Sequence, residues 1–486
     1  MNPRTQSFLR RLIFFCWAFL ISSGALPAAT RPPNILLIIG DDLSFHDLGC
    51  WGNRDVHTPN IDRLASEGLR LTRCFAPAPM CSPLRQSLYT GLHPVKNGAY
   101  PNHSFVKLGT KSLPHYLQPL GYRVGLVGKT HFGPPDCYPF EYPGQKNNPT
   151  NSAATPSAQP SEQIGSLDIG AIEEFIRRDP SAPFCLVAAS NEPHSPWNRG
   201  DASRYDPLKL KLPPYFVDTP ETRAALANYY AEVTVLDEQV GRILQLLAQS
   251  GQASNTFVLF ISEQGSSFPH SKWTLYEPGI RGALIARWPG RITAGRSTDA
   301  LCSYVDILPT LMEIAGGSPA QGLAGSSLWP LLAGKTNQHT DYIFAEQTSR
   351  GIVNGPSAFG IRCVRDARYK LILNLNPEIE FRDEATAEKN PVFTSWRKLA
   401  ETDAFAREQV DRYRHRPALE LYDCENDPWE TENLAADPAQ QSRVKTLRAK
   451  LDAWMKAQGD LGVATELAAN KRQGGAKKAA AQAETE

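Results

Sequence analysis

The sequence predicts an α/β protein. A large doubly wound mixed or parallel sheet would be sandwiched by helices, and a smaller C-terminal α+β subdomain would carry an antiparallel sheet. Three observations predict this fold: continuous apolar runs end in polar loops, helical patterns lie between the runs, and the pattern changes after about residue 320. Strands that alternate with helices are typical of doubly wound domains.

Four apolar runs supply the main predicted strands, namely residues 34–40, 122–128, 184–190 and 256–262. Each run is continuous rather than alternating, which indicates a strand buried on both faces, as in a parallel sheet. Ligands of such sheets bind at the carboxyl ends of the strands. We therefore expect the polar residues that follow the runs to meet at one edge: Asp41, Asp42, Lys129, His131, His194, Glu263 and Gln264.

The helical segments and the later strands have recognisable ends. Residues 58–68 and 219–251 each begin with Thr and Pro and close on Gly, which are helix start and stop signals. Residues 363–375 and 419–435 are typical of antiparallel strands, the second with an Asn-Asp-Pro turn. We predict an α/β domain over residues 30–320 and an α+β subdomain over residues 321–465.

The two ends of the chain differ from the rest. Arg4, Arg10 and Arg11 precede an apolar run and then small residues, which is the pattern of a secretion signal. The alternative is a membrane anchor, but the run is short for a span. We predict a cleaved signal peptide over residues 1–29, a periplasmic or secreted protein and no stable membrane span. Residues 466–486 have low complexity, and we predict a disordered tail there.

The composition argues against several partners. The 486-residue chain has a formal net charge of +1, so no broad basic field favours a nucleic-acid partner. Of its 9 cysteines, Cys16 lies in the predicted signal and the others are scattered without a CxxC pair, which argues against a structural zinc site. A core of this size needs no disulfide framework.

Acidic and amide groups follow two of the predicted strands. Asp41 and Asp42 repel each other unless a cation lies between them; the alternative is a solvated turn or a helix cap. Glu263 and Gln264 are weak signals alone. Together the four residues offer hard oxygen ligands, which suit Ca²⁺ or Mg²⁺.

Basic side chains lie in the same loops: Arg85, Lys129, His131, His194 and Lys272. The alternative for each is ordinary surface charge, and for His194 a packed loop histidine. Beside a divalent cation, such a set would hold a small tetrahedral anion and stabilise charge on its oxygens. Histidine can also transfer a proton near neutral pH.

Cys81 lies in the stretch "CSPLRQSLYTG", which we interpret as a Pro-containing loop. A thiol nucleophile needs a paired base, and usually a helix N-terminus. As a metal ligand, a thiolate is out of place among hard oxygens. A cysteine oxidised to an aldehyde and hydrated would present two hydroxyls, which are hard ligands and nucleophiles.

This stretch resembles the signature of the formylglycine-dependent sulfatases of the alkaline phosphatase superfamily, C-x-P-x-R followed by T-G. Other segments agree, among them "RPPNILLIIGDDLSFHDLGCWGN", "GKTHFG" and "KWTLYEPGIRGALIARWPG". The resemblance runs from residue 32 to about residue 434. Segments such as "KNGAYPNH" are similar to heparan N-sulfatase (sulfamidase)-like bacterial sulfatases.

The resemblance implies a nucleophile and a metal site. Cys81 would become formylglycine, whose hydrate attacks sulfur and coordinates Ca²⁺, or Mg²⁺. The second hydroxyl then expels sulfate and regenerates the aldehyde. The maturation partner would be a formylglycine-generating or a radical sulfatase-maturating enzyme. The other metal ligands would be Asp41, Asp42, Glu263 and Gln264.

The resemblance also implies roles for the basic residues. Arg85 steadies the hydrate, and Lys129 and Lys272 hold sulfate oxygens. His131 assists the breakdown of the sulfated intermediate, and His194 protonates the leaving oxygen or nitrogen.

The chain departs from the family pattern at one place. The family usually has Asp followed by Asn or His where this chain has Glu263 and Gln264, each one methylene longer. A sulfated carbohydrate is the implied substrate, either N-sulfoglucosamine of heparin or heparan sulfate or an O-sulfated polysaccharide. The alternatives are a related metal-dependent phosphodiester or phosphonate hydrolase and a non-catalytic glycan-binding protein.

Overall fold

The computed structural model describes residues 31–144 and 167–472. The predicted signal peptide, residues 1–29, lies outside the described residues. The described residues from Pro33 onward form one compact unit. Within the described ranges, no helix is both long and apolar enough to cross a membrane.

The larger sheet has eight strands in the order β3-β4-β1-β5-β6-β2-β7, with β8 paired to β2. β1 is parallel to both β4 and β5, and β3 is parallel to β4. β6 runs antiparallel to β5 and to β2. The strands are β1 (Asn34–Gly40), β2 (Leu69–Phe75), β3 (Arg123–Gly128), β4 (Phe184–Ala189), β5 (Thr256–Ser262), β6 (Arg281–Arg287), β7 (Arg296–Thr298) and β8 (Cys302–Ser303).

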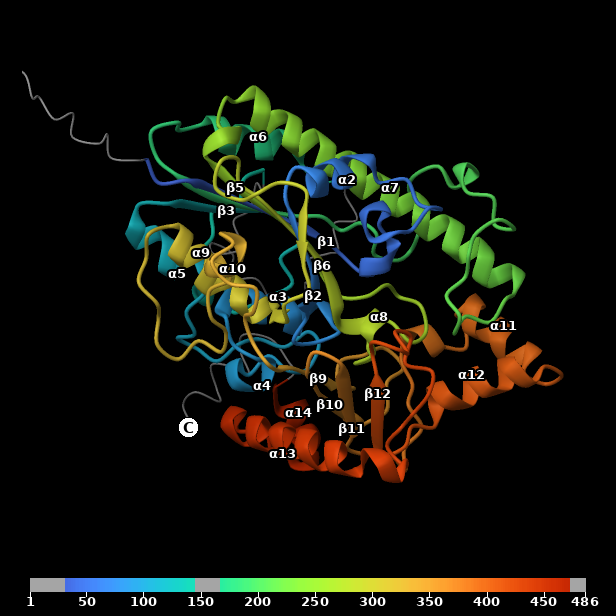
Figure 1. The fold of residues 1–486 in the computed structure, drawn as a ribbon. Coiled ribbons are helices and arrows are strands. Elements are labelled where there is room, and N and C mark those ends of the chain that lie inside the picture. Colours follow the sequence, from blue (N-terminus) through green and yellow to red (C-terminus); the bar gives the residue numbers. More distant parts are fainter. Residues whose placement is uncertain (1–30, 145–166, 473–486) are drawn as a thin grey trace, which may run out of the picture. The chain divides into compact units, whose positions relative to one another are not determined.

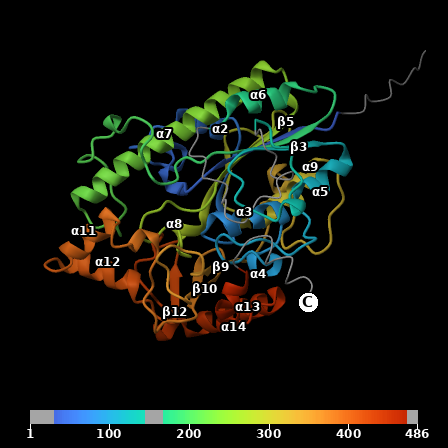
Figure 2. The ribbon, with the colours of Figure 1, turned by 180° about the vertical axis from the view of Figure 1, so that it is seen from behind.

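Helices cover both faces of this sheet (Figures 1 and 2). One layer holds the long helix α7 with its neighbours α2 and α6, and the other holds α3, α5, α9 and α10. β1 and β5 are buried along their whole length because they lie between these layers, as their apolar runs predict. The helices are α2 (Pro59–Ser66), α3 (Cys81–Thr90), α4 (Pro94–Asn97), α5 (Leu113–Leu117), α6 (Ile169–Arg177), α7 (Pro220–Gln249), α8 (Glu277–Ile280), α9 (Ile307–Ile314) and α10 (Trp329–Leu332).

A second sheet of four antiparallel strands follows, in the order β12-β11-β10-β9. Leu371 and Leu421 lie in an apolar cluster with Leu447 and Leu451 of α13, so this helix covers one face. Ile361 and Ile372 belong to the main core on the other face. The elements are β9 (Ile343–Thr348), β10 (Gly360–Arg365), β11 (Tyr369–Asn374), β12 (Leu419–Asp423), α11 (Pro391–Leu399), α12 (Ala404–Arg414), α13 (Gln441–Gln458) and α14 (Val463–Arg472).

The structure confirms the predicted fold class and differs from the prediction in detail. The predicted tail begins inside α14, because the buried Glu466 carboxylate accepts hydrogen bonds from the amides of Ser349 and Phe359. Residues 473–486 lie outside the described residues. Strand β12 ends at Asp423 and the chain then turns, in keeping with the Asn-Asp-Pro turn predicted within residues 419–435.

Candidate active site

The carboxyl ends of the parallel strands meet at one edge of the larger sheet, as predicted. Asp41, Lys129 and Glu263 come directly after the last residues of β1, β3 and β5, and Asp42 is one residue further on than Asp41. His194 lies in the loop after β4. The Glu263 amide donates to the carbonyl of Gly40, which brings the β1 and β5 loops side by side.

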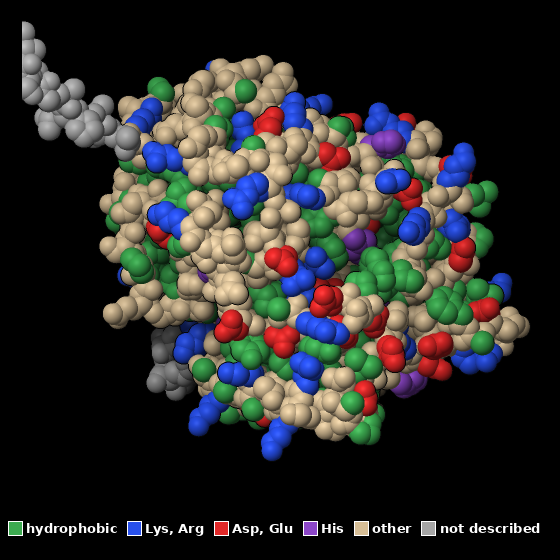
Figure 3. Space-filling view, viewed as in Figure 1, with side chains coloured by type: hydrophobic (Ala, Val, Ile, Leu, Met, Phe, Trp, Pro, Cys, Tyr) green, Lys and Arg blue, Asp and Glu red, His purple; other side chains and the backbone are tan. Residues whose placement is uncertain are grey.

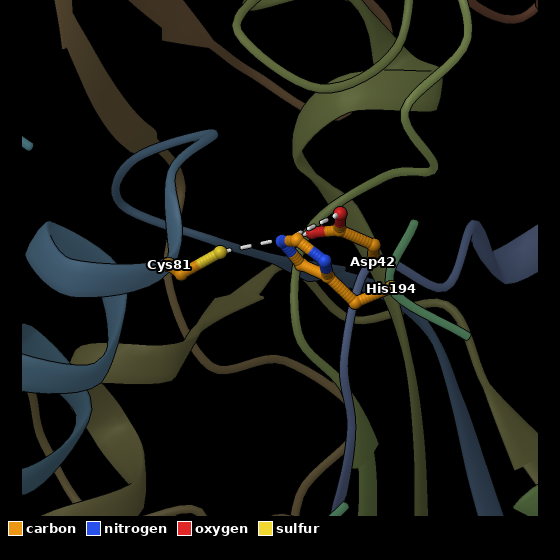
Figure 4. A group of neighbouring side chains, drawn as sticks. All are labelled: Asp42, Cys81 and His194. Atoms are coloured by element: carbon orange, nitrogen blue, oxygen red, sulfur yellow. Dashed lines mark hydrogen bonds and ion pairs between the residues drawn. The ribbon is translucent and has the colours of Figure 1, made fainter. Parts of the chain in front are cut away.

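Cys81 is the first residue of helix α3, so the interpretation of this stretch as a loop is wrong. Pro83 lies in the first turn of the helix, where backbone N–H groups have no intrahelical partner, so proline is tolerated there. The Cys81 thiol is buried and lies 3.7 Å from Oδ1 of Asp41 and 3.7 Å from Oδ1 of Asp42. Figure 4 shows it pointing at Asp42 beside His194.

Asp42 is the centre of one set of contacts. Its Oδ2 accepts from Lys272 Nζ at 2.7 Å and from Ser267 Oγ at 2.8 Å, and lies 3.6 Å from His194 Nε2. Lys272 Nζ is 3.3 Å from the same His194 nitrogen. His194 Nδ1 lies 2.6 Å from the carbonyl oxygen of Ser195, which orients the ring so that Nε2 faces the site.

Asp41 and Glu263 form a second set with Arg85, one turn along α3. Arg85 donates through Nε and Nη2 to the two oxygens of Glu263, at 2.9 and 2.8 Å, and its Nη2 lies 3.7 Å from Asp41 Oδ1. Its Nη1 donates to the carbonyl of Lys129 at 3.0 Å. Lys129 Nζ forms an ion pair with Asp41 Oδ2 at 2.5 Å. Arg85 therefore joins the β3 and β5 loops to the Cys81 helix.

The site is electrostatically balanced. Burial raises the pKa of the Asp41 and Asp42 carboxyls, but the charges of Lys129 and Lys272 respectively, with other neighbours, outweigh burial, so both pKa values lie below the ordinary range. Burial likewise raises the pKa of the Cys81 thiol, and the same two lysines outweigh it, so the net shift is downward. Burial raises the pKa of the Glu263 carboxyl well above its ordinary range, and the neighbouring Arg85 opposes this only in part. Asp41 and Asp42 are therefore the two carboxylates whose charge the lysines compensate.

The residues fit a hard divalent cation. One ligand atom each from Asp41, Cys81 and Glu263 lies within 4.8 Å of the others. Gln264 Nε2 contacts Asp42 Oδ1 and lies 3.3 Å from the Cys81 sulfur, while its buried Oε1 has no hydrogen-bond partner among the described residues. Turning this amide by half a rotation would aim its oxygen at the carboxylates, an arrangement that a cation between them stabilises.

His131 lies outside this ring of contacts. No hydrogen bond joins it to Cys81 among the described residues; its Nε2 lies 2.9 Å from Nδ1 of His103. The charges of Lys129, Arg85 and Asp41 still act on it, which places it at the margin of the site.

Two contributors were missed by reasoning from the sequence. Ser267 holds Asp42, and its only signal is its position three residues after Gln264. His103 lies in the stretch "KNGAYPNH", whose resemblance to sulfamidase-like segments gives no role to this histidine. Neither a serine nor a histidine in a loop carries a spacing pattern that predicts such contacts.

The two sheets and their helical layers form an alkaline phosphatase-like fold. A family model described as Sulfatase matches residues 33–318, more than half of the chain, and the chain belongs to that family. It is thus a sulfuric ester or sulfamide hydrolase. A second model, described as N-sulphoglucosamine sulphohydrolase, C-terminal, matches residues 267–391. Sulfatases generally depend on formylglycine and a metal.

Two curated relatives match over most of their length. An ulvan-active sulfatase of Formosa agariphila is 31% identical over 437 residues, which cover 89% of this chain and 82% of the relative. N-sulphoglucosamine sulphohydrolase of Homo sapiens is 30% identical over 481 residues, which cover 90% and 92%.

Solved structures agree in fold. One, in complex with its substrate D-glucosamine-2-N,6-O-disulfate, has a TM-score of 0.65 at 20% identity and covers 89% of this chain and 99% of that one. A phosphonate monoester hydrolase of Agrobacterium radiobacter has a TM-score of 0.65 at 22% identity, with coverage of 88% and 96%. At these identities the likeness concerns the fold alone.

Proposed function

We propose that this protein removes sulfate from a sulfated carbohydrate, with formylglycine formed from Cys81 and a cation held by Asp41, Asp42, Glu263 and Gln264. One observation carries the proposal: Cys81 begins a helix and points at two buried carboxylates that are themselves paired with lysines. Hydrated formylglycine would supply a nucleophilic hydroxyl in place of the thiol, and Ca²⁺, or Mg²⁺, would draw charge from sulfate oxygens.

The chain's own side chains suit sulfate binding. Lys129 is paired with Asp41 and Lys272 with Asp42. Each lysine can also direct an N–H at a sulfate oxygen. Burial lowers the Lys129 and Lys272 pKa, but the Asp41 and Asp42 carboxylates outweigh it, and both lysines stay charged. Glu263 holds the Arg85 guanidinium in place, so its positive charge stays one helical turn from Cys81.

His194 is placed to protonate the leaving atom. Burial lowers the pKa of its imidazole, but Asp42 outweighs burial and the net shift is upward. The Nδ1 contact with Ser195 leaves Nε2 facing Asp42 and Lys272, so a proton on Nε2 is directed into the site.

The first experiment is the mass of the peptide that contains Cys81, from protein made in a host that can carry out the modification. We expect the mass of the aldehyde or its hydrate. An unmodified thiol would contradict the formylglycine proposal and favour a non-catalytic glycan-binding role. Cys81→Ser should abolish turnover and leave the thermal unfolding temperature unchanged.

The substrate is tested by the sulfate released from glucosamine N-sulfate, glucosamine 6-O-sulfate and ulvan oligosaccharides, measured by ion chromatography. The human relative and the C-terminal family model support an N-sulfated glucosamine. The Formosa relative, an ulvan-active sulfatase, supports ulvan as the alternative substrate. A phenylphosphonate ester tests the second candidate, a phosphonate hydrolase, an activity known for a protein that shares this fold. Turnover of that ester alone would contradict the sulfatase proposal.

The cation is tested by chelation. EDTA should remove turnover and lower the unfolding temperature, and added Ca²⁺ should restore both, because a ligand that binds only the folded state stabilises it. The variant Gln264→Leu removes one proposed ligand and should weaken the response to Ca²⁺. An unchanged response in this variant would remove Gln264 from the ligand set.

We further propose export to the periplasm or the medium, with cleavage near residue 29, on the basis of the N-terminal sequence pattern. N-terminal sequencing of protein from a periplasmic fraction tests this. Retention of Met1 in a cytoplasmic fraction would contradict it. The maturation enzyme would be of the oxygen-dependent or the radical kind, and expression with and without oxygen distinguishes them.

A further inference from the structure

Two histidine rings are joined at the margin of the site. His131 Nε2 and His103 Nδ1 lie 2.9 Å apart, and the ring centroids are 4.8 Å apart. His131 is partly buried, and its Nδ1 is shielded from solvent and has no hydrogen-bond partner among the described residues. His103 is exposed. The pair therefore runs from the interior to the surface.

The backbone holds both rings in place. His103 and His131 have φ of 58° and 54°, in the left-handed region that few residues other than glycine adopt. The Val106 amide donates to the carbonyl of Gly133, which ties the two segments together. Gln86 of α3, the Cys81 helix, accepts at its Oε1 from the Val106 amide at 3.1 Å. The histidine pair is thus fixed relative to Cys81 by a side chain of the same helix.

The surroundings keep His131 neutral. Burial, with the charges of Lys129, His103 and Arg85, lowers the pKa of its imidazole well below the ordinary value, and Asp41 opposes this only in part. A neutral imidazole carries one proton on one nitrogen. The hydrogen bond to His103 therefore decides whether the other nitrogen, Nδ1, offers a lone pair or an N–H.

We propose that His103 is a positioning residue: its Nδ1 accepts the Nε2 proton of His131 and so holds His131 in the Nε2–H tautomer. The buried Nδ1 of His131 then carries a lone pair, which is the form that can accept a proton during turnover. The turnover part of this inference rests on the proposed function.

The tautomer is tested by NMR of the histidine side chains, with ¹⁵N-labelled, metal-free protein in which Cys81 is unmodified. His131→Gln assigns the signal. In the wild type, we expect the Nε2–H tautomer of His131. His103→Gly removes the ring without strain at positive φ and should mix the tautomers. His103→Asn also tolerates this backbone, retains an acceptor oxygen near the position of Nδ1 and should keep the wild-type tautomer. An unchanged tautomer in His103→Gly would overturn the positioning role.

Turnover tests the role of the tautomer. His103→Gly should lower kcat by about tenfold or more while KM stays unchanged, and His103→Asn, which retains an acceptor oxygen, should keep most of the wild-type kcat. Added imidazole should rescue His103→Gly in part. His415→Asn, which changes another exposed histidine, is the control and should match the wild type. An unchanged kcat in His103→Gly would overturn the role of this tautomer in turnover. Absence of wild-type turnover on every sulfate would instead count against the proposed function, and the NMR result would stand alone.

Discussion

Single residues in the site depend on partners far away in the sequence. Arg85 and Glu263 are both fully buried, and their two hydrogen bonds join α3 to the loop after β5. A buried ion pair of this kind adds little net stability, but removing one partner leaves an uncompensated charge.

We therefore predict that Arg85→Met lowers the free energy of unfolding by about 3–5 kcal/mol, measured by urea denaturation. Arg178→Met is the matched control: Arg178 and Glu141 form an exposed pair, with side chains 42% and 39% accessible. That change should cost about 0–1 kcal/mol. Equal losses in the two variants would show that burial does not set the cost.

His194→Ala is predicted to separate substrates by leaving group. A sugar sulfate releases a poor leaving group and should lose about 10²–10⁴-fold in kcat, because it needs the proton. An activated aryl sulfate releases a stable phenolate and should lose far less. The measurement is the ratio of the two kcat losses, with His415→Ala as the control. A ratio of one would remove the acid role.

Individual strands carry charge as well as apolar side chains. Glu346 of β9 is buried; it accepts from the Val95 amide at 2.8 Å and lies 3.8 Å from Arg362 Nε. Arg362 has a closer partner, Asp460, at 2.5 Å. Burial is the main cause of the rise in the Glu346 pKa from 4.5 to about 7, and Arg362 offsets it only in part.

This pKa predicts a pH dependence of stability. The folded state keeps the Glu346 proton between pH 4.5 and about 7, while the unfolded state releases it, so the free energy of unfolding falls as the pH rises through this window. The loss is of order 3 kcal/mol. Glu346→Gln keeps the contact with Val95 and should remove this fall, so that the variant is the more stable protein at pH 8. Parallel pH profiles for the variant and the wild type, from urea denaturation, would contradict the prediction.

At the scale of the whole molecule, the two sheets share one core. Glu277 of α8 contacts Arg365 and Lys370 of the second sheet through fully buried ion pairs. The charged side chains of the surface are of both signs and interspersed on the face in Figure 3, in keeping with the net charge of +1.

We predict that both sheets unfold in a single calorimetric transition. Leu37→Ala in β1 and Leu371→Ala in β11 change fully buried side chains, and each should cost about 2–5 kcal/mol and move that same transition. Leu208→Ala, at a side chain 82% exposed, is the control and should change little. Two separate transitions, each moved by only one of the variants, would show that the second sheet unfolds independently.

The parallel part of the fold and most of the site could be predicted from local patterns. The runs that become β1, β3, β4 and β5 are continuous because both faces are covered, and parallel order brings their ends together. The antiparallel strands β2 and β6 escaped prediction. β2 is only partly buried, and its mixed pattern of apolar and charged residues is compatible with several structures.

Local patterns in the sequence were sufficient to predict the strand ends, the helix ends and the importance of the stretch around Cys81. What required the folded chain is every contact across long sequence separations, such as Arg85 with Glu263 and His103 with His131. Side-chain direction, burial and ring orientation come from packing between elements, and residues tens to hundreds of positions apart carry no local signal of it. The assignment of Cys81 to a loop was wrong for the same reason. A proline in the first turn of a helix cannot be told from a proline in a loop without the packing that fixes the helix.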